Sequence, residues 1–223
     1  MNVFVLHEDP VIAAQMHCDK HVPKMIVESA QMISTAHRMC DGSTIMKPSK
    51  SGKRIIKYWE HPDPLDEELL YKAVHHNHPC TIWTRESLNN YNWHYELFAE
   101  LCNEFTKRFK KTHLTESLLL ERLKKPPVNI PRDRGFTNFA MAMSNLPECI
   151  TPDPVESYRN YYMAKQSYMP CDWNKGTPMP SWFKKLDEAG VQMFLQEKQQ
   201  AKQKQNMHEA MKESTYAAQY SEI

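Results

Sequence analysis

The sequence predicts a mainly α fold: a single compact helical domain with a short β element and a polar helix or tail at the C-terminus. Apolar side chains recur at helical spacing along most of the chain, and several Asp-Pro pairs have the form of helix starts. Only five of the 223 residues are glycine. We expect the helical domain to span residues 1–185 and the tail to span residues 186–223.

The elements of the N-terminal part follow from apolar runs and prolines. Asn2–Leu6 is a candidate for a short buried strand. Asp9-Pro10 predicts a helix to about Lys20, and Pro23 predicts the start of a second helix over 23–40. The buried face of the second helix is expected to consist of Met25, Ile26, Ser29, Met32, Ile33 and Ala36. Its polar stripe is expected to consist of Lys24, Glu28, Gln31, Thr35 and Arg38.

The remaining elements alternate between helices and proline-rich loops. Two apolar runs around the turn Ser51-Gly52 predict a hairpin over 44–59. Helices are expected over 63–74, 77–111 (as one helix or two), 115–125 and 153–168. KKPPVNIPRDRG predicts a basic loop and CDWNKGTPMPSWF an aromatic loop. The Gln- and Lys-rich segment from residue 186 predicts an exposed helix or a flexible tail.

Several classes of protein are not supported by the composition. No apolar run approaches the roughly 20 residues of a membrane span, and no basic region precedes the short N-terminal apolar run, as a secretory signal requires. Six cysteines without a CxxC pair indicate reduced thiols in a cytosolic protein. GxGxxG and GxxxxGK[ST] motifs are absent, so no cofactor is expected.

The stretch CDKHVPKMIVESAQM, residues 18–32, carries most of the candidate chemistry. Lys24 and Glu28 are one helical turn apart, which is the spacing of a surface ion pair. Alternatively, Pro23 places Lys24 in the first turn, where the helix dipole disfavours a cation and favours a phosphate. Glu28 could then act as a base or orient a water molecule. The spacing alone leaves both interpretations open.

Histidine and cysteine clusters raise the question of a metal site, and aromatic and arginine residues in loops raise that of a nucleic-acid site. No metal is expected, because the histidine and cysteine clusters lack CxxC or HExxH patterns. The less specific metal candidates are His17, Cys18 and His21 in one cluster and His76, His78 and Cys80 in another.

Trp173 and Trp182 lie in proline-rich loops and are candidates for stacking on a nucleic-acid base, whereas most other aromatic residues are expected in the core. Arg132 and Arg134 could bind phosphates.

Two blocks, and a third that is less specific over Tyr158–Phe183, resemble the pyrimidine-dimer DNA glycosylase (endonuclease V-like) family. DKHVPKMIVESAQM resembles the family motif D-K-R-L-G-K-Q-x-x-E-x-x-Q, with histidine at position 21 where arginine is usual and proline at position 23 where glycine is common. The matching residues are Asp19, Lys20, Lys24, Glu28 and Gln31. A second block, residues 77–101, matches the family pattern at His78, Pro79 and Trp83. Over most of residues 1–183 the chain resembles uncharacterised proteins of tailed bacteriophages.

The resemblance implies a small helical DNA-binding protein in the cytoplasm of an infected bacterial host. Family members use the amine of an N-terminal threonine, exposed after methionine removal, to attack the sugar carbon of a damaged nucleotide. Asn2 stands at that position here and is too large for the usual methionine removal, so Met1 is expected to persist. A hydrolytic glycosylase, in which Asp19 or Glu28 activates water, needs no such amine.

The expected function is that of a phage-encoded DNA base-processing enzyme, most simply an N-glycosylase acting on a damaged or modified pyrimidine. DNA is the expected partner, a membrane is not, and the oligomeric state is open. The expected catalytic residues are Asp19, Glu28 and His21. The expected DNA-binding residues are Lys20, Lys24, Arg132, Arg134, Trp173 and Trp182. A non-catalytic DNA- or protein-binding factor and a DNA base-modifying transferase are the alternatives on the same scaffold.

Overall fold

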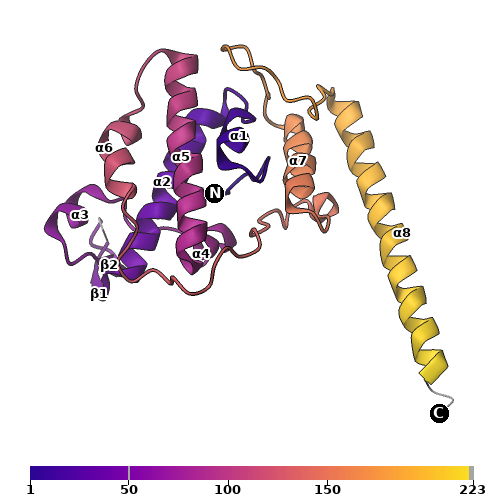
Figure 1. The fold of residues 1–223 in the computed structure, drawn as a ribbon, viewed down its shortest axis with the longest axis horizontal. Coiled ribbons are helices and arrows are strands. Elements are labelled where there is room, and N and C mark those ends of the chain that lie inside the picture. The colour runs from indigo at the N-terminus through magenta and orange to yellow at the C-terminus, as the bar shows by residue number, and fades with distance from the viewer. Residues whose placement is uncertain (50, 221–223) are drawn as a thin grey trace. The chain divides into compact units, whose positions relative to one another are not determined.

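The computed structural model of the chain describes residues 1–49 and 51–220. Its fold is mainly α, with one β hairpin among the described residues, and Figure 1 shows the order of the elements. The predicted fold class is therefore confirmed. The elements are α1 (Pro10–Gln15), α2 (His21–Cys40), β1 (Ser43–Pro48), β2 (Ile55–Glu60), α3 (Pro64–Leu69), α4 (Pro79–Glu86), α5 (Leu88–Phe109), α6 (Leu114–Leu123), η1 (Pro147–Cys149), α7 (Pro154–Ala164), η2 (Lys165–Ser167) and α8 (Glu188–Tyr220).

The chain divides into two compact units. The first consists of Met1–Ala142 with Cys171–Ser181, and the second consists of Met143–Pro170 with Trp182–Ile223. The predicted domain boundary between residues 185 and 186 falls inside the second unit. The division into a domain over 1–185 and a tail over 186–223 stays a prediction. Residues 221–223 of the predicted tail lie outside the described residues.

Helix starts follow the capping residues of the sequence. Asp9, Asp63 and Asp153 each accept a hydrogen bond from a backbone N–H of the first helical turn. A proline follows each of them, at the position where a missing N–H costs nothing. The predicted helical region over 77–111 is two helices, because Ser87 adopts an extended backbone and caps α5.

Two helices are shorter than predicted. α1 ends at Gln15 rather than near Lys20, because the chain turns and the backbone N–H of Asp19 donates to the carbonyl of Asp172 over 2.8 Å. α3 ends where the backbone becomes extended at Leu70. Both ends depend on contacts or backbone turns that helical periodicity does not encode.

The core of the first unit lies between α2 and α5, which run side by side in Figure 1. α4 and α6 also pack against α2. The predicted buried face of α2 is confirmed, since Met25, Ile26, Ser29, Met32, Ile33 and Ala36 are at most 1% exposed. Glycine-free helices with apolar stripes explain why this pair forms the centre of the unit.

The predicted polar stripe of α2 is only partly at the surface. Thr35 and Arg38 are buried, at 0% and 1% exposure. The Arg38 guanidinium donates to the backbone carbonyls of Trp59 and Leu70 and pairs with the Glu67 carboxylate. A buried arginine with these partners fastens β2 and α3 to α2.

The predicted strand over Asn2–Leu6 does not form. The segment is buried, as a continuous apolar run predicts, with exposures of 2% for Val3 and 0% for Leu6. Within the described residues, however, strands occur only in the β1–β2 hairpin, so this segment has no strand to pair with. Burial of an apolar run was therefore predicted correctly and its secondary structure was not.

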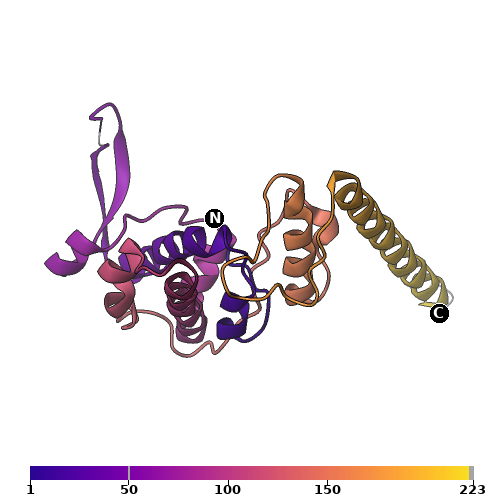
Figure 2. The same cartoon turned by 90° about the horizontal axis from the view of Figure 1, so that it is seen from above.

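The predicted hairpin over 44–59 is confirmed. β1 pairs antiparallel with β2, from Ser43 opposite Glu60 to Pro48 opposite Ile55. Figure 2 shows the hairpin projecting from the helices of its unit. Met46 is 65% exposed and Ile55 is 62% exposed, whereas Tyr58 and Trp59 are buried, so the end of β2 contributes to the core.

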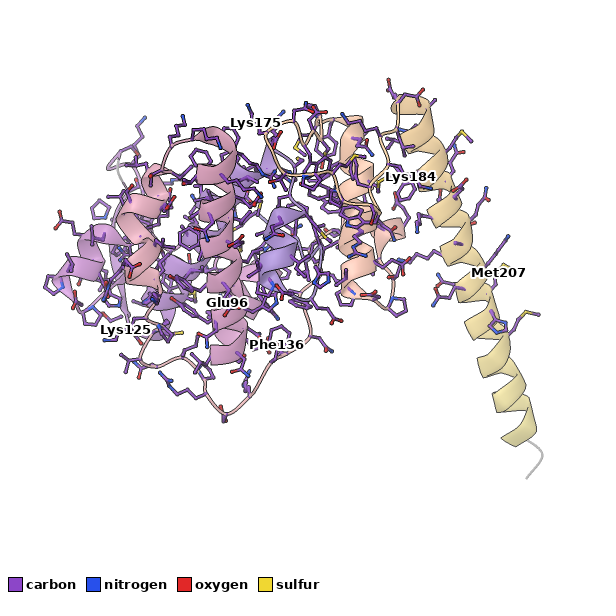
Figure 3. All side chains as sticks on the ribbon, turned by 45° about the horizontal axis from the view of Figure 1, so that its top comes forward. Glu96, Lys125, Phe136, Lys175, Lys184 and Met207 are labelled. Atoms are coloured by element: carbon purple, nitrogen blue, oxygen red, sulfur yellow. The ribbon has the colours of Figure 1, made fainter. Side chains whose placement is uncertain are left out.

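In the second unit, α8 packs against η1, α7 and η2. Val191, in its first turn, is fully buried, whereas Met207 is 66% exposed and projects from the helix in Figure 3. The segment that the sequence predicts as a helix or flexible tail is thus helical, and only its beginning belongs to a core. No helix in the described part of the chain combines the length and apolarity needed to cross a membrane.

Candidate functional site

The N-terminal amine lies beside the side chain of Glu28, a residue of α2, and Figure 1 marks the N-terminus near that helix. The amine nitrogen of Met1 is 3.7 Å from Oε2 of Glu28, and the backbone N–H of Asn2 donates to the same oxygen over 3.0 Å. Oε1 of Glu28 is 3.6 Å from Nζ of Lys24. The Glu28 side chain is 15% exposed, so this carboxylate is largely shielded and has two cations as neighbours.

Side-chain contacts hold the N-terminus in this position. The Asn2 amide donates from Nδ2 to the carbonyl of Ala142 over 2.9 Å and accepts at Oδ1 from Sγ of Cys80 over 3.4 Å. Thr81 donates to the sulfur of Met1. Since Cys80 and Thr81 belong to the first turn of α4, the stretch over 18–32 and the block over 77–101 meet at the N-terminal amine.

His78 also belongs to this site. Its Nδ1 accepts from the backbone N–H of Cys80 and so caps α4. Burial, then the charge of the N-terminal amine and the neighbouring His75, lower the pKa of His78. A neutral imidazole therefore stands near the amine and Glu28 at neutral pH.

The arrangement around Glu28 suits acid–base chemistry. A partly shielded carboxylate can accept a proton from water or from an amine that attacks a sugar carbon. The Lys24 side chain is 59% exposed and belongs to the first turns of α2, where a phosphate oxygen can approach from solvent. Glu28 and Lys24 thus place a carboxylate that can accept a proton and an exposed cation on neighbouring turns.

Asp19 makes contacts of a different kind. Its Oδ1 is 3.1 Å from Nη1 of the buried Arg108, and its Oδ2 accepts from the backbone N–H of Asn174 over 2.7 Å. Both carboxylate oxygens therefore bond to residues far from Asp19 in the sequence and link those segments. The geometry favours Glu28 over Asp19 as a reacting carboxylate, and a catalytic role for Asp19 stays a prediction.

His21 is also in the interior. It is 1% exposed, and its ring lies 5.0 Å from that of Phe4. His17 is fully buried nearby, and burial lowers its pKa to about 4 despite a hydrogen bond to the carbonyl of Ala13. Neither position gives a phosphate access from solvent.

The metal candidates from the sequence do not converge. His76 packs on the ring of Trp59, while His78 and Cys80 are engaged by the α4 cap and by Asn2. Across residues 1–49 and 51–220, one group of three side chains brings possible ligand atoms together, and none of the sequence candidates is in it. That group consists of His37, Asp41 and His61.

The DNA-binding candidates fall in both units. Lys20 and Arg132 are exposed in the first unit, and the Arg134 side chain is 59% exposed with Glu86 at 3.7 Å. Trp173, in the same unit, is only 9% exposed. In the second unit, the guanidinium of Arg159 lies 5.4 Å from the ring centre of Trp182. The basic candidates are therefore accessible, whereas Trp173 offers little ring surface for a base.

The sequence analysis considered the N-terminal amine, Asn2 and Cys80, but it did not predict that they lie beside Glu28 or each other. The apolar run at residues 2–6 was a usable signal for the position of the N-terminus. Because this run is buried, the amine that precedes it lies close to the core. The sequence analysis also did not name His37 and Asp41 as possible metal ligands. Their separation by one helical turn at the end of α2 was the available signal.

Comparisons of the chain with protein-family models, with curated protein sequences and with solved structures found no match. The glycosylase resemblance therefore stays an expectation, and the function is argued from the site itself.

Proposed function

We propose that the protein is a DNA base-processing enzyme, an N-glycosylase that acts on a damaged or modified pyrimidine, with Glu28 as the reacting carboxylate. The observation that carries this proposal is the convergence of the Met1 amine, the Asn2 N–H and Lys24 on one partly buried carboxylate. The glycosylase resemblance implies a reacting N-terminal amine, and the amine of this chain lies next to the Glu28 carboxylate.

The hydrolytic reaction requires one base. Glu28 accepts a proton from a water molecule, the water oxygen bonds to the sugar C1′, and the pyrimidine leaves with the electron pair of the broken C–N bond. The Met1 amine, 3.7 Å from the same carboxylate, is the alternative nucleophile. Both routes use Glu28 and release the same base.

Exposed basic side chains supply the DNA contacts in this proposal. Lys20 and Lys24 are on the surface at the start of α2, and Arg132 and Arg134 are on the surface of the loop after α6. Contacts of this kind go to phosphates and give affinity without sequence preference. They support a role in holding the strand rather than in choosing the base.

The test is to incubate the chain with DNA from phage particles and from uninfected bacteria and to analyse the products by mass spectrometry. We expect a free pyrimidine in the soluble fraction and an equal amount of abasic sites in the DNA. Altered nucleosides that remain in the polymer would identify a transferase instead. Binding without any released or altered base would contradict an enzymatic role.

Borohydride reduction then separates the two nucleophiles. Attack by the Met1 amine forms an imine with the sugar, which reduction converts to a stable protein–DNA cross-link, whereas attack by water leaves nothing to reduce. Acetylation of the N-terminus is the matched control, because it removes the nucleophile and leaves Glu28 in place.

A further inference from the structure

A second cluster of reactive side chains lies away from Glu28 in the first unit. One possible ligand atom from each of His37, Asp41 and His61 lies within 4.8 Å of the others. His37 and Asp41 are one turn apart at the C-terminal end of α2, and His61 follows β2. Glu28 and His37 are separated by roughly 13 Å along the helix, because an α-helix rises about 1.5 Å per residue.

The three side chains line a cavity of about 270 Å³. Asp63, Asp66 and Arg122 also line it, as does Lys125, which Figure 3 labels at the edge of the unit. Arg122 is paired with the Asp66 carboxylate, so its charge is already compensated. The volume of the cavity leaves room for a further ligand, such as water, on an ion bound by the three side chains.

The hydrogen bonds of His37 leave one ring nitrogen available as a ligand. Its Nε2 lies 2.8 Å from the hydroxyl oxygen of Tyr91, and that hydroxyl donates its only proton to the carbonyl of Leu123 over 2.6 Å. Nε2 of His37 must therefore donate, which places the lone pair of the neutral ring on Nδ1.

His61 supplies an unsatisfied nitrogen. The residue is 7% exposed, and its Nε2 has no hydrogen-bond partner anywhere in the described chain. Its Nδ1 accepts from the backbone N–H of Asp63 over 3.2 Å and lies 3.6 Å from Oδ2 of Asp66. If Nε2 binds an ion, the ring proton moves to Nδ1, which then no longer accepts from the Asp63 N–H and instead faces the Asp66 carboxylate, as in other metal-bound histidines.

Asp41 is oriented by backbone groups. Its two carboxylate oxygens accept from the N–H groups of Asn129 and Val128, each over 2.8 Å. Each oxygen retains lone pairs, so the same carboxylate can bind a cation while the loop after α6 keeps it in place. The donor set is therefore two imidazoles and one oriented carboxylate.

We propose that His37, Asp41 and His61 bind a divalent transition-metal ion of the zinc class, with an open coordination position facing the cavity. Two imidazoles and a carboxylate suit Zn²⁺, which takes such ligands at about 2 Å in a tetrahedron. Tetrahedral ligand atoms are then about 3.3 Å apart, and side-chain rotations close the remaining distance. The ion links the end of α2 to the segment after β2, and this proposal does not depend on the proposed glycosylase function.

The experiment uses the full chain without an affinity tag, stripped with a chelator and titrated with Zn²⁺ in a calorimeter. We expect one ion per chain, an increase in melting temperature on binding, and visible ligand-field absorption when Co²⁺ replaces Zn²⁺. His61→Gln should weaken the affinity by at least about tenfold, as loss of a metal-site partner does. His208→Gln, which changes an exposed histidine of α8, should leave the affinity unchanged.

Circular dichroism of each variant without metal separates lost binding from lost folding. If His61→Gln does not fold, Asp41→Asn takes its place, because asparagine keeps an oxygen for a backbone N–H. Absence of stoichiometric binding by the parent chain would overturn the proposal. Three other results would also overturn it. The parent and a folded ligand variant could bind Zn²⁺ with equal affinity, or His76→Gln could be the one variant that loses binding. The chain could also bind inorganic phosphate in place of zinc.

Discussion

Arg108 joins α5 to the segment between α1 and α2 through a single side chain. Its guanidinium donates to the backbone carbonyls of Gln15 and His17 and pairs with the carboxylates of Asp19 and Glu104, at 3.1 and 2.7 Å. The arginine side chain is fully buried, so each of its donors needs a partner. This network explains why Asp19 is held so firmly at the joint between α1 and α2.

Removing the arginine should therefore destabilise the protein. Arg108→Met leaves the Glu104 carboxylate, 2% exposed, without its main cation, and we expect a loss of about 3 kcal/mol in the free energy of unfolding. Chemical denaturation measures it. Lys107→Met is the matched control: Lys107 pairs with the same Glu104 but is 52% exposed, so its loss should cost under about 1 kcal/mol. Equal effects of the two changes would contradict the assignment.

Lys24 should contribute to DNA affinity without affecting stability. Its side chain is 59% exposed, so Lys24→Ala should weaken binding to any sequence and reduce the salt dependence of the affinity by about one phosphate contact. Fluorescence anisotropy at several salt concentrations measures both quantities. Lys204→Ala, an exposed lysine of α8, is the control. An unchanged salt slope in Lys24→Ala would limit Lys24 to its ion pair with Glu28.

At the scale of elements, the sequence predicts helix starts better than helix ends. The Asp-Pro pairs cap helices through contacts within the first turn, which are local and visible in the sequence. The end of α1 depends on a hydrogen bond between Asp19 and Asp172, far apart in the chain. Burial of Arg38 likewise depends on carbonyls from other elements, so periodicity placed it in a polar stripe.

The beginning and the end of α8 should differ in their importance for folding. Val191 is fully buried, and burial of such a side chain contributes roughly 1.5–3 kcal/mol. A chain that ends at Lys185 should therefore melt at a lower temperature, whereas a chain that ends at Asn206 should melt as the parent does. Thermal unfolding followed by circular dichroism tests both. A parent-like melt of the shorter chain would show that α8 contributes nothing to the second unit.

Buried histidines should make the stability of the whole molecule depend on pH. Burial lowers the pKa of His17 from 6.5 to about 4 and that of His94 from 6.5 to about 3. The unfolded chain takes up these protons near pH 6.5 and the folded chain does not, so their contribution is complete above about pH 6.5 and is lost as the pH falls towards 4.

We expect the denaturation midpoint to fall between about pH 6.5 and 5, above the range in which most carboxylates take up protons. Denaturant titrations with a chelator present, to exclude metal effects, measure the midpoint. His94→Gln should show a shallower pH dependence than the parent, and His208→Gln should match the parent. A midpoint that stays constant over this range would contradict neutral buried histidines.

For the molecule as a whole, the sequence predicted more of the fold than of the candidate site. The mainly α class, the hairpin and the buried face of α2 follow from patterns within single elements. The site requires Met1, Asn2 and Cys80 to meet Glu28, and those residues come together only when the N-terminal segment is buried against α2 and α4. The sequence named Glu28 and Lys24 because both lie in one short stretch of one helix.

The central claim is that Glu28 is the reacting carboxylate, and its most direct test is the rate of base release by Glu28→Gln. On the DNA that yields a free pyrimidine with the parent chain, we expect this nearly isosteric change to lower the rate by roughly 100-fold or more, with DNA affinity and melting temperature unchanged. Glu96→Gln, an exposed glutamate on α5 that Figure 3 labels, should release base at the parent rate. Base release by Glu28→Gln at the parent rate would contradict the account.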